Sequence, residues 1–234
     1  GLFEKVFLSI SHDNPHPKVI INLVEKKYST AKVGVRYDLE KSTRGLLELG
    51  NENTFGIGAK TQLQFQYGLH DQLILLKLRA DRIFKTYLTY DLSFYYKNNR
   101  NFLLYYSGIH GTYLDTRRGG DFSIGMQMEK FGTVTFEFGT ENLDIITHPF
   151  PQYNESLDLR TFTLRSVVDT QDKYPFPDKG NLYHLYYQRS AKILGGNVSY
   201  SKIFASFEFY QTIKEVHTIH PHIALGVADE TLPF

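Results

Sequence analysis

The chain has 234 residues, 41% hydrophobic and 22% charged, and it has no run of about 18 consecutive apolar residues, so a helical membrane protein is excluded. Lys and Arg (26) nearly balance Asp and Glu (25), which leaves no basic face to gather nucleic acid, and no nucleic-acid partner is expected. Cysteine is absent, which excludes disulfides, thiolate metal sites and a cysteine nucleophile.

The N-terminal segment predicts a β-hairpin. Residues 6–10 and 19–24 alternate between apolar and polar side chains, and residues 12–17 between them contain two prolines and an Asp-Asn pair. Such turn-forming residues between two alternating runs are typical of a connection between paired strands.

From Ala31 onward, runs of about ten residues alternate in the same way and are separated by Gly, Asn, Asp or charged residues. In one run Leu63, Phe65 and Tyr67 share a face, and three glutamines at 62, 64 and 66 share the other. Three glutamines in register are not compatible with a packed soluble core. About twelve strands of this kind are expected between Val33 and Val227, and no helical period interrupts them.

Strand length separates a soluble, lipid-binding β-barrel from a membrane barrel. Soluble strands favour about five or six residues, whereas a tilted membrane strand needs about nine to eleven. Residues 86–97 and 101–114 are predicted to be strands of the longer kind, and short links such as 68–71 coexist with long links such as 148–156. The sequence therefore predicts an all-β fold, an antiparallel transmembrane β-barrel.

Several segments resemble the BamA-like outer-membrane assembly superfamily, in which periplasmic POTRA domains precede a barrel with the bacterial surface antigen signature. Residues 1–6 and 19–26 resemble the last helix-to-strand corner and final strands of a POTRA domain. Residues 166–172, followed by Phe176-Pro177-Asp178-Lys179-Gly180, are similar to the family's D-x-R-D and F-P-x-x-G hairpin, with Gln171 where Arg is usual. Segments 194–196, 217–219 and 232–234 look most like the branch in which the barrel follows a patatin-type lipase domain.

The resemblance implies that residues 1–28 are the C-terminal part of a POTRA domain and residues 29–234 are the barrel. Family members continue into a long loop with an Arg-containing motif and four closing strands. The chain is therefore expected to be a fragment that carries about twelve of sixteen strands. The implied location is the outer membrane of a Gram-negative-type cell, with the POTRA part in the periplasm, and the implied partners are membrane lipid and a client or passenger polypeptide.

The first barrel strand is the main functional candidate. In the family, this strand pairs poorly with the last one, so its edge can open and template an incoming strand. Val33, Val35, Tyr37 and Leu39 would form this lateral seam. The same residues fit an ordinary closed strand equally well.

The hairpin motif has two interpretations. Asp169, Asp172, Phe176, Pro177 and Gly180 can form a tight connection between strands, with Gly180 allowing a positive φ. The resemblance alone suggests a second role, the support of an inserted loop.

Polar-face side chains are predicted to line the lumen, and these are Lys77, Arg79, Arg160, Arg165, His220 and His222. Two imidazoles at i and i+2 could bind a metal ion, but filling of the lumen is the simpler prediction, so no metal or other cofactor is expected. Pro221 between the two histidines predicts a local distortion, because proline cannot donate to the ladder.

No catalytic site is expected. Ser107 and Ser123 lie near glycines, yet neither has the G-x-S-x-G spacing of a nucleophile elbow. Any lipase activity would lie in an upstream patatin-like domain. The leading hypothesis is a translocation or insertion barrel, and the alternative is a passive channel or anchor for that upstream domain.

Overall fold

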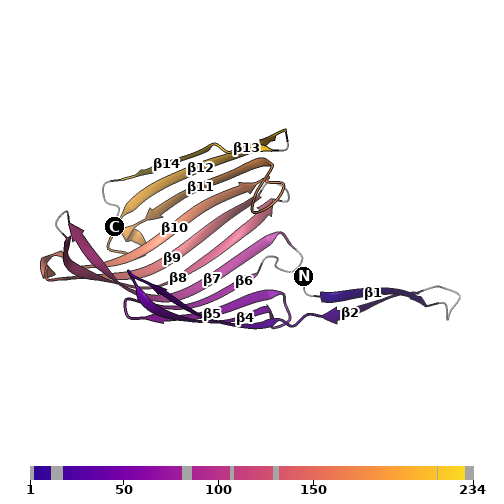
Figure 1. Ribbon diagram of the computed structural model, residues 1–234, viewed down its shortest axis with the longest axis horizontal. Helices are drawn as coiled ribbons and strands as arrows, with labels where there is room; N and C mark the ends of the chain where they lie inside the picture. Colours follow the sequence, from indigo (N-terminus) through magenta and orange to yellow (C-terminus); the bar gives the residue numbers. More distant parts are fainter. Residues whose placement is uncertain are drawn as a thin grey trace.

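The computed structural model describes residues 3–11, 18–80, 86–105, 108–128, 132–214 and 216–229. Figure 1 shows a broad curved sheet and a narrow hairpin that projects away from it. The strands are β1 (Phe3–Ser11), β2 (Lys18–Glu25), β3 (Ser29–Asp38), β4 (Ser42–Thr54), β5 (Ala59–Gly68), β6 (Asp71–Ala80), β7 (Leu88–Tyr105), β8 (Gly108–Met128), β9 (Gly132–His148), β10 (Glu155–Asp169), β11 (Lys179–Ser190), β12 (Tyr200–Ile213), β13 (His217–Ile219) and β14 (His222–Ala228). Two 3-10 turns, η1 (Pro151–Tyr153) and η2 (Lys192–Leu194), lie in connections.

The projecting hairpin consists of β1 and β2, which pair antiparallel in a sheet of their own. The two strands predicted near the N-terminus are therefore present. The predicted turn at residues 12–17 lies outside the described residues, as do residues 1 and 2. At the base of the hairpin, Lys26 Nζ lies 3.9 Å from Glu52 Oε2, and the Glu52 amide donates to the Tyr28 carbonyl at 2.9 Å.

The large sheet has 12 antiparallel strands, and this confirms the predicted all-β fold. Strands β3 to β12 each pair with their neighbours in sequence, and β13 and β14 both pair with β12. Within the part of the chain that the structure describes, no strand bridges β3 and the β13/β14 edge, so the sheet is open. Those two edges lie on opposite sides of the curved sheet in Figure 1.

Alternation explains why these segments pair as they do. Leu63 and Phe65 of β5 lie opposite Leu76 and Ile74 of β6, so their apolar side chains fall on one face. A shift of one residue would move every one of these side chains to the other face. The link between β5 and β6 consists only of residues 69 and 70, as the predicted short turn requires.

The predicted strand at 101–114 is wrong. Residues 101–105 continue β7, residues 108–114 begin β8, and the two strands run antiparallel with Tyr105 opposite Gly108. The polar run 98–101 resembled a turn in the sequence, but its residues pair with β8, Asn98 opposite Thr116 and Asn101 opposite Tyr113. Polar side chains are tolerated there because this part of the strand extends past the apolar band.

The predicted distortion at Pro221 is confirmed. It separates β13 from β14, which pair with successive parts of β12. The Phe209 amide donates to the Pro221 carbonyl at 3.2 Å, so contact with β12 persists across the break. The residues predicted to alternate here keep their faces: Ile223, Leu225 and Val227 on one, His222 and Ala224 on the other.

The connection between β11 and β12 folds back onto β10. The Asn197 amide donates to the Asp158 carbonyl at 2.9 Å, and the Asn197 side-chain oxygen accepts from the Asp158 amide at 2.8 Å. Asn197 thus forms with β10 the hydrogen bonds that a further residue of β11 would form. Next to it lies the small buried cluster of Leu143, Leu157, Leu159 and Tyr200.

Candidate functional site

The two faces of the large sheet differ in chemistry. One face is apolar from β4 to β14 and carries, among others, Leu47, Leu63, Phe65, Ile74, Leu76, Leu92, Phe94, Phe122, Ile124, Phe136, Phe138, Phe162, Leu164, Tyr183, Leu185, Ile203, Phe207, Ile223 and Leu225. The other face is polar, and side chains from β7 to β12 line one hollow of about 430 Å³ on it. Strands so far apart share a hollow because this face is concave. An apolar convex face and a polar concave face are the arrangement of a membrane barrel.

Ion pairs join neighbouring strands across the concave face. Lys77 Nζ lies 2.9 Å from Asp91 Oδ2, and Arg165 lies 3.7 Å from Glu137 Oε2. Arg79 is two residues from Lys77 on the same strand and therefore shares its face. Three of the four cations predicted to face the lumen, Lys77, Arg79 and Arg165, thus lie on the polar face.

Arg160 is the exception, and the prediction for it is corrected. It is five residues from Arg165 on β10, and no register shift separates the two. Because faces alternate at every residue, Arg160 shares the convex face with Phe162 and Leu164. It lies opposite Thr140, at the end of the apolar band.

A second concave-face group surrounds Tyr186. The Arg165 guanidinium lies 5.7 Å from the centroid of the Tyr186 ring, and Lys202 Nζ lies 5.8 Å from the same centroid. On the same face Gln188 donates to Thr163 Oγ1 at 3.1 Å and accepts from the Tyr200 hydroxyl at 3.2 Å. These contacts tie β10, β11 and β12 together on the face that also lines the hollow.

Sequence reasoning missed an ionic cluster near the first strands. Arg44 of β4 donates to Asp71 Oδ2 at 2.7 Å and also pairs with Asp38, and Gln66 donates to Asp71 Oδ1 at 2.6 Å. Farther round the sheet, Lys41 Nζ donates to Asn101 Oδ1 at 2.5 Å. A signal was present, because the charged residues occupy polar-face positions beside two short turns, 39–41 and 69–70.

The candidate seam lies on β3, at one edge of the sheet. Val33 lies opposite Leu47 and Tyr37 lies opposite Thr43, so the inner edge of β3 is fully paired with β4. The other edge has no strand partner among the described residues. The side chains of Val33 and Val35 are 80% and 78% exposed on the apolar face. Leu39 follows the end of the strand and is also exposed.

The opposite edge carries the two histidines. His220 and His222 are on the concave face with Glu208, and His220 Nε2 lies 3.0 Å from Glu208 Oε2. The Tyr210 ring stacks on His220 at a centroid distance of 4.1 Å. No group of three or more His, Asp or Glu side chains suited to a metal ion occurs in the described ranges.

The hairpin motif forms the connection between β10 and β11. Asp172 Oδ1 accepts from the amides of Asp178 and Lys179 at 3.0 and 3.3 Å, and Lys173 Nζ lies 2.5 Å from Asp178 Oδ2. Partial desolvation acts to raise the pKa of Asp172, but the amides of Lys179 and Asp178 outweigh it and hold the pKa below its usual value. The pKa of Lys173 is raised by its hydrogen bond to Asp178.

Gly180, the second residue of β11, has φ of 117°, as the motif predicts. A Cβ at Gly180 would lie 2.4 Å from the Thr170 carbonyl oxygen, so a side chain has no room. Phe176 and Pro177 lie in the connection between β10 and β11, and Phe176 is exposed. The motif residues therefore lie in one connection and in the strand residues that flank it, and Asp169 accepts from the Gln171 amide at 2.9 Å.

No helix in the described part of the chain is long and apolar enough to cross a membrane.

Comparisons with known proteins agree with this geometry. Residues 53–234 match the model of the Omp85 superfamily domain. The fold is similar to that of BamA from Haemophilus ducreyi in a crystal structure that lacks POTRA domains 1-3, with a TM-score of 0.78 and 14% identity. The similarity covers 98% of this chain and 47% of that one, so the chain spans about half of that structure. Among curated proteins no match is found. The match covers most of the chain, so the chain belongs to the Omp85 superfamily of outer-membrane β-barrels.

Proposed function

We propose that the barrel inserts or translocates a client polypeptide by pairing a client strand with the free edge of β3. The observation that carries this proposal is the ten-residue edge of β3, which is paired on one side only among the described residues. Its apolar face, with Val33, Val35 and Tyr37, matches the lipid-facing side of an arriving membrane strand.

The driving force is backbone pairing in lipid. Unpaired N–H and C=O groups have no water to bond in the bilayer, and each costs several kcal/mol. A client strand that pairs with β3 satisfies its own groups and those of the edge together, which is strand addition to an exposed sheet edge. No nucleotide or metal ion is needed for this step.

In this proposal the β1–β2 hairpin is the end of a periplasmic POTRA domain that delivers the client. All of its described side chains are exposed, including Phe7, Ile10 and Ile21, so the hairpin has apolar surface to offer a partner. The concave-face cations, among them Lys77, Arg79 and Arg165, and the two histidines would line the barrel interior. The motif with Asp169, Asp172 and Gly180 would fix one end of the barrel.

A disulfide across the seam tests the proposal in the full-length protein that contains this chain. Since the chain has no cysteine, V35C can be paired with single cysteines along the last barrel strand of that protein. Oxidation should slow insertion of a model outer-membrane barrel into liposomes at least about tenfold, and a reductant should restore it. The matched control is L47C/F65C, which locks the closed seam between β4 and β5, where the two residues are directly opposite.

The outcome distinguishes the two functional hypotheses. If the locked V35C seam inserts the client as fast as the reduced protein, the barrel is a passive channel or an anchor for an upstream patatin-like domain. Equal loss in V35C and in L47C/F65C would show that the barrel merely has to flex, and it would also contradict a specific role for β3.

A further inference from the structure

Three arginines gather on the convex face at one end of the apolar band. Arg118 of β8 lies opposite Asn142, Arg160 of β10 lies opposite Thr140, and Arg189 of β11 lies opposite Phe162. Arg160 and Arg189 are diagonal neighbours, with Cα atoms about 8 Å apart. Arg118 is two strands and one two-residue step from Arg160, or about 12 Å. Arg118 and Arg189 lie on opposite sides of Arg160, about 20 Å apart, so one phosphate can contact two neighbouring arginines at a time, and a headgroup with two phosphates can span all three.

This arginine row (Arg118, Arg160 and Arg189) is short of negative partners. Arg118 lies 3.2 Å from Asp144 but remains 63% exposed, and within the described residues neither Arg160 nor Arg189 forms an ion pair. Asp158 shares their face, but its Oδ1 accepts a hydrogen bond from Asn142. Like charges on neighbouring strand positions repel. An anion between them would relieve that repulsion.

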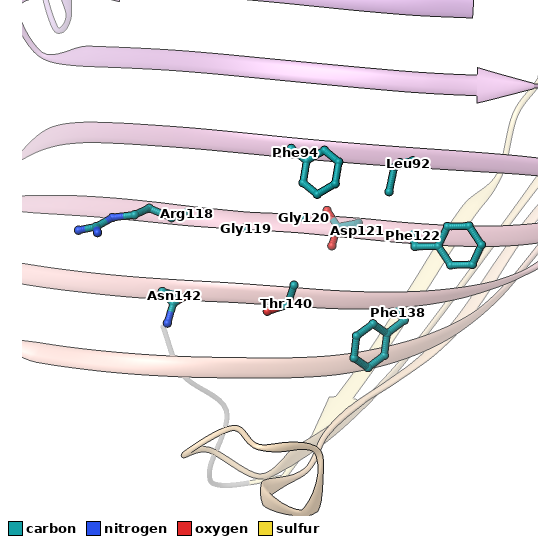
Figure 2. Close-up of a pocket in the computed structure, with 10 residues that line it drawn as sticks. All are labelled: Leu92, Phe94, Arg118, Gly119, Gly120, Asp121, Phe122, Phe138, Thr140 and Asn142. Atoms are coloured by element: carbon teal, nitrogen blue, oxygen red, sulfur yellow. The ribbon is translucent and has the colours of Figure 1, made fainter. Parts of the chain in front are cut away.

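An apolar groove of about 380 Å³ runs from Arg118, the first member of the arginine row, into the band (Figure 2). Gly120 has no side chain and the Phe94 ring covers it, so the groove passes beside this ring toward Thr140. Phe122 and Phe138 lie at one end, and Arg118 and Asn142 lie at the other. A groove with apolar walls and a cationic end fits a molecule with an acyl chain and an anionic headgroup.

We propose that this surface binds a phosphorylated glycolipid of the outer leaflet, with a phosphate on the arginine row and an acyl chain in the groove between Arg118 and Phe122. Guanidinium groups bind phosphate oxygens through paired hydrogen bonds, which suits a fixed site better than a general surface charge does. In the loop after Arg189, Ile193 is 93% exposed beside Lys192, so a further apolar side chain is available to an acyl chain at this end.

The assignment to the outer leaflet rests on the proposed function. The arginine row lies toward the β7–β8 connection, at the end of the sheet where Lys41 of the β3–β4 turn contacts Asn101. The β1–β2 hairpin joins the start of β3, which is the other end. If the hairpin is periplasmic, the arginine row faces the outer leaflet.

The test measures lipid retained by the detergent-purified, full-length protein after exchange with defined lipids. A lipid A-type glycolipid with two phosphates should be retained at least about fivefold more than its dephosphorylated form and more than phosphatidylglycerol or phosphatidylcholine. R118Q/R160Q/R189Q should lose this preference, and the matched control R165Q, an arginine on the concave face, should keep it. R118K/R160K/R189K should retain an intermediate amount, because charge persists without the paired geometry.

Equal retention of the phosphorylated and dephosphorylated lipids would overturn the proposal, and so would loss in R165Q. A preference for phosphatidylglycerol over the glycolipid would also overturn it, because the site would then serve the other leaflet. If the triple glutamine variant does not fold, the single variants R118Q and R189Q, both at exposed positions, decide the same question. The disulfide test measures client insertion and the lipid test measures retained glycolipid. A locked seam that does not slow insertion would contradict the proposed function and leave lipid retention unchanged, so the two proposals fail separately.

Discussion

The Tyr95 hydroxyl of β7 donates a 2.6 Å hydrogen bond to Glu141 Oε2 of β9, and it crosses the intervening strand β8 at Gly119. A Cβ at Gly119 would lie 2.8 Å from the Tyr95 hydroxyl and 2.6 Å from the Thr140 carbonyl oxygen. Glycine is therefore required for this crossing. Arg117 beside it lies 3.6 Å from Glu141 and 2.9 Å from Asp115, which completes a concave-face network over three strands.

Filling the space at Gly119 should break this crossing. G119V forces the Tyr95 ring off its glycine and separates it from Glu141, and overpacking together with a lost hydrogen bond is expected to lower the free energy of unfolding by about 2–3 kcal/mol. The change is measured by urea titration of the detergent-folded barrel, in which the folded fraction is read from the shift in gel migration on heating. G45A is the control, because its Cβ would meet only the Tyr67 carbonyl oxygen, at 4.0 Å. A G119V protein as stable as G45A would show that the crossing is dispensable.

Loss of the Arg44 guanidinium should be costly. The side chains of Arg44 and Asp71 are 15% and 8% exposed, so R44M leaves a nearly buried carboxylate without its cation. R44M should therefore lower the free energy of unfolding more than a substitution of an exposed arginine does, because the remaining hydrogen bond from Gln66 to Asp71 carries no positive charge. R36Q removes another arginine near Asp38, but Arg36 is exposed and 3.6 Å away, so the change should be under about 0.5 kcal/mol. Similar melting curves for R44M and R36Q would contradict this ranking.

The turn between β10 and β11 should loosen in acid. Because the pKa of Asp172 is lowered in the folded protein, its carboxylate stabilises the turn above the usual aspartate pKa of about 3.9. This stabilisation is lost as the pH falls through the lowered folded-state pKa. Protection of the Asp178 and Lys179 amides against hydrogen exchange should fall over this range in the wild type.

D172N keeps an oxygen that can accept both amides but removes the charge. In D172N, protection of the Asp178 and Lys179 amides against hydrogen exchange should therefore be weaker at neutral pH and should not change through the acid range. The control is D229N, an aspartate that bonds the Ser201 amide at the far end of β12, and it should leave the acid response of the turn intact. An unchanged acid response in D172N would mean that another group titrates.

The opposite faces of β10 can be read with single cysteines, since the chain has none of its own. A fluorophore at L164C should be quenched by lipids that carry a nitroxide on the acyl chain, and a fluorophore at R165C should not. Fluorophores at R160C should respond to a nitroxide on the headgroup, because Arg160 lies at the end of the apolar band. Strong acyl-chain quenching at position 165 would reverse the assignment of the two faces.

Much of the fold was predictable because period-two alternation over long runs has one simple explanation. The faces of β5, β6 and β14 follow from the sequence, as does the break at Pro221. The misplaced strand at 101–114 shows where this reasoning ends. A polar run can be a turn, or it can be a strand that continues past the membrane, and only its partner on β8 decides.

The candidate site was less predictable, for two physical reasons. Arg160 and Arg165 both occupy positions that look polar in the sequence, yet their separation of five positions places them on opposite faces of a strand. The Arg44 cluster and the Tyr95–Glu141 crossing depend on which strands become neighbours and on the curvature of the sheet. Neither the neighbours of a strand nor the curvature of the sheet can be read from the sequence of a single strand.

The two glycines at 119 and 120 also bear on how the barrel avoids errors as it forms. Phe94 covers Gly120 on the convex face, and Tyr95 covers Gly119 on the concave face. If β7 slipped by two residues against β8, its faces would be unchanged, but Phe94 would meet Arg118 or Phe122 and Tyr95 would meet Arg117 or Asp121. The pair of glycines therefore accepts one alignment of strands of 18 and 21 residues and rejects its near neighbours. In this way two residues without side chains fix the register of the longest strand pairing among the described residues.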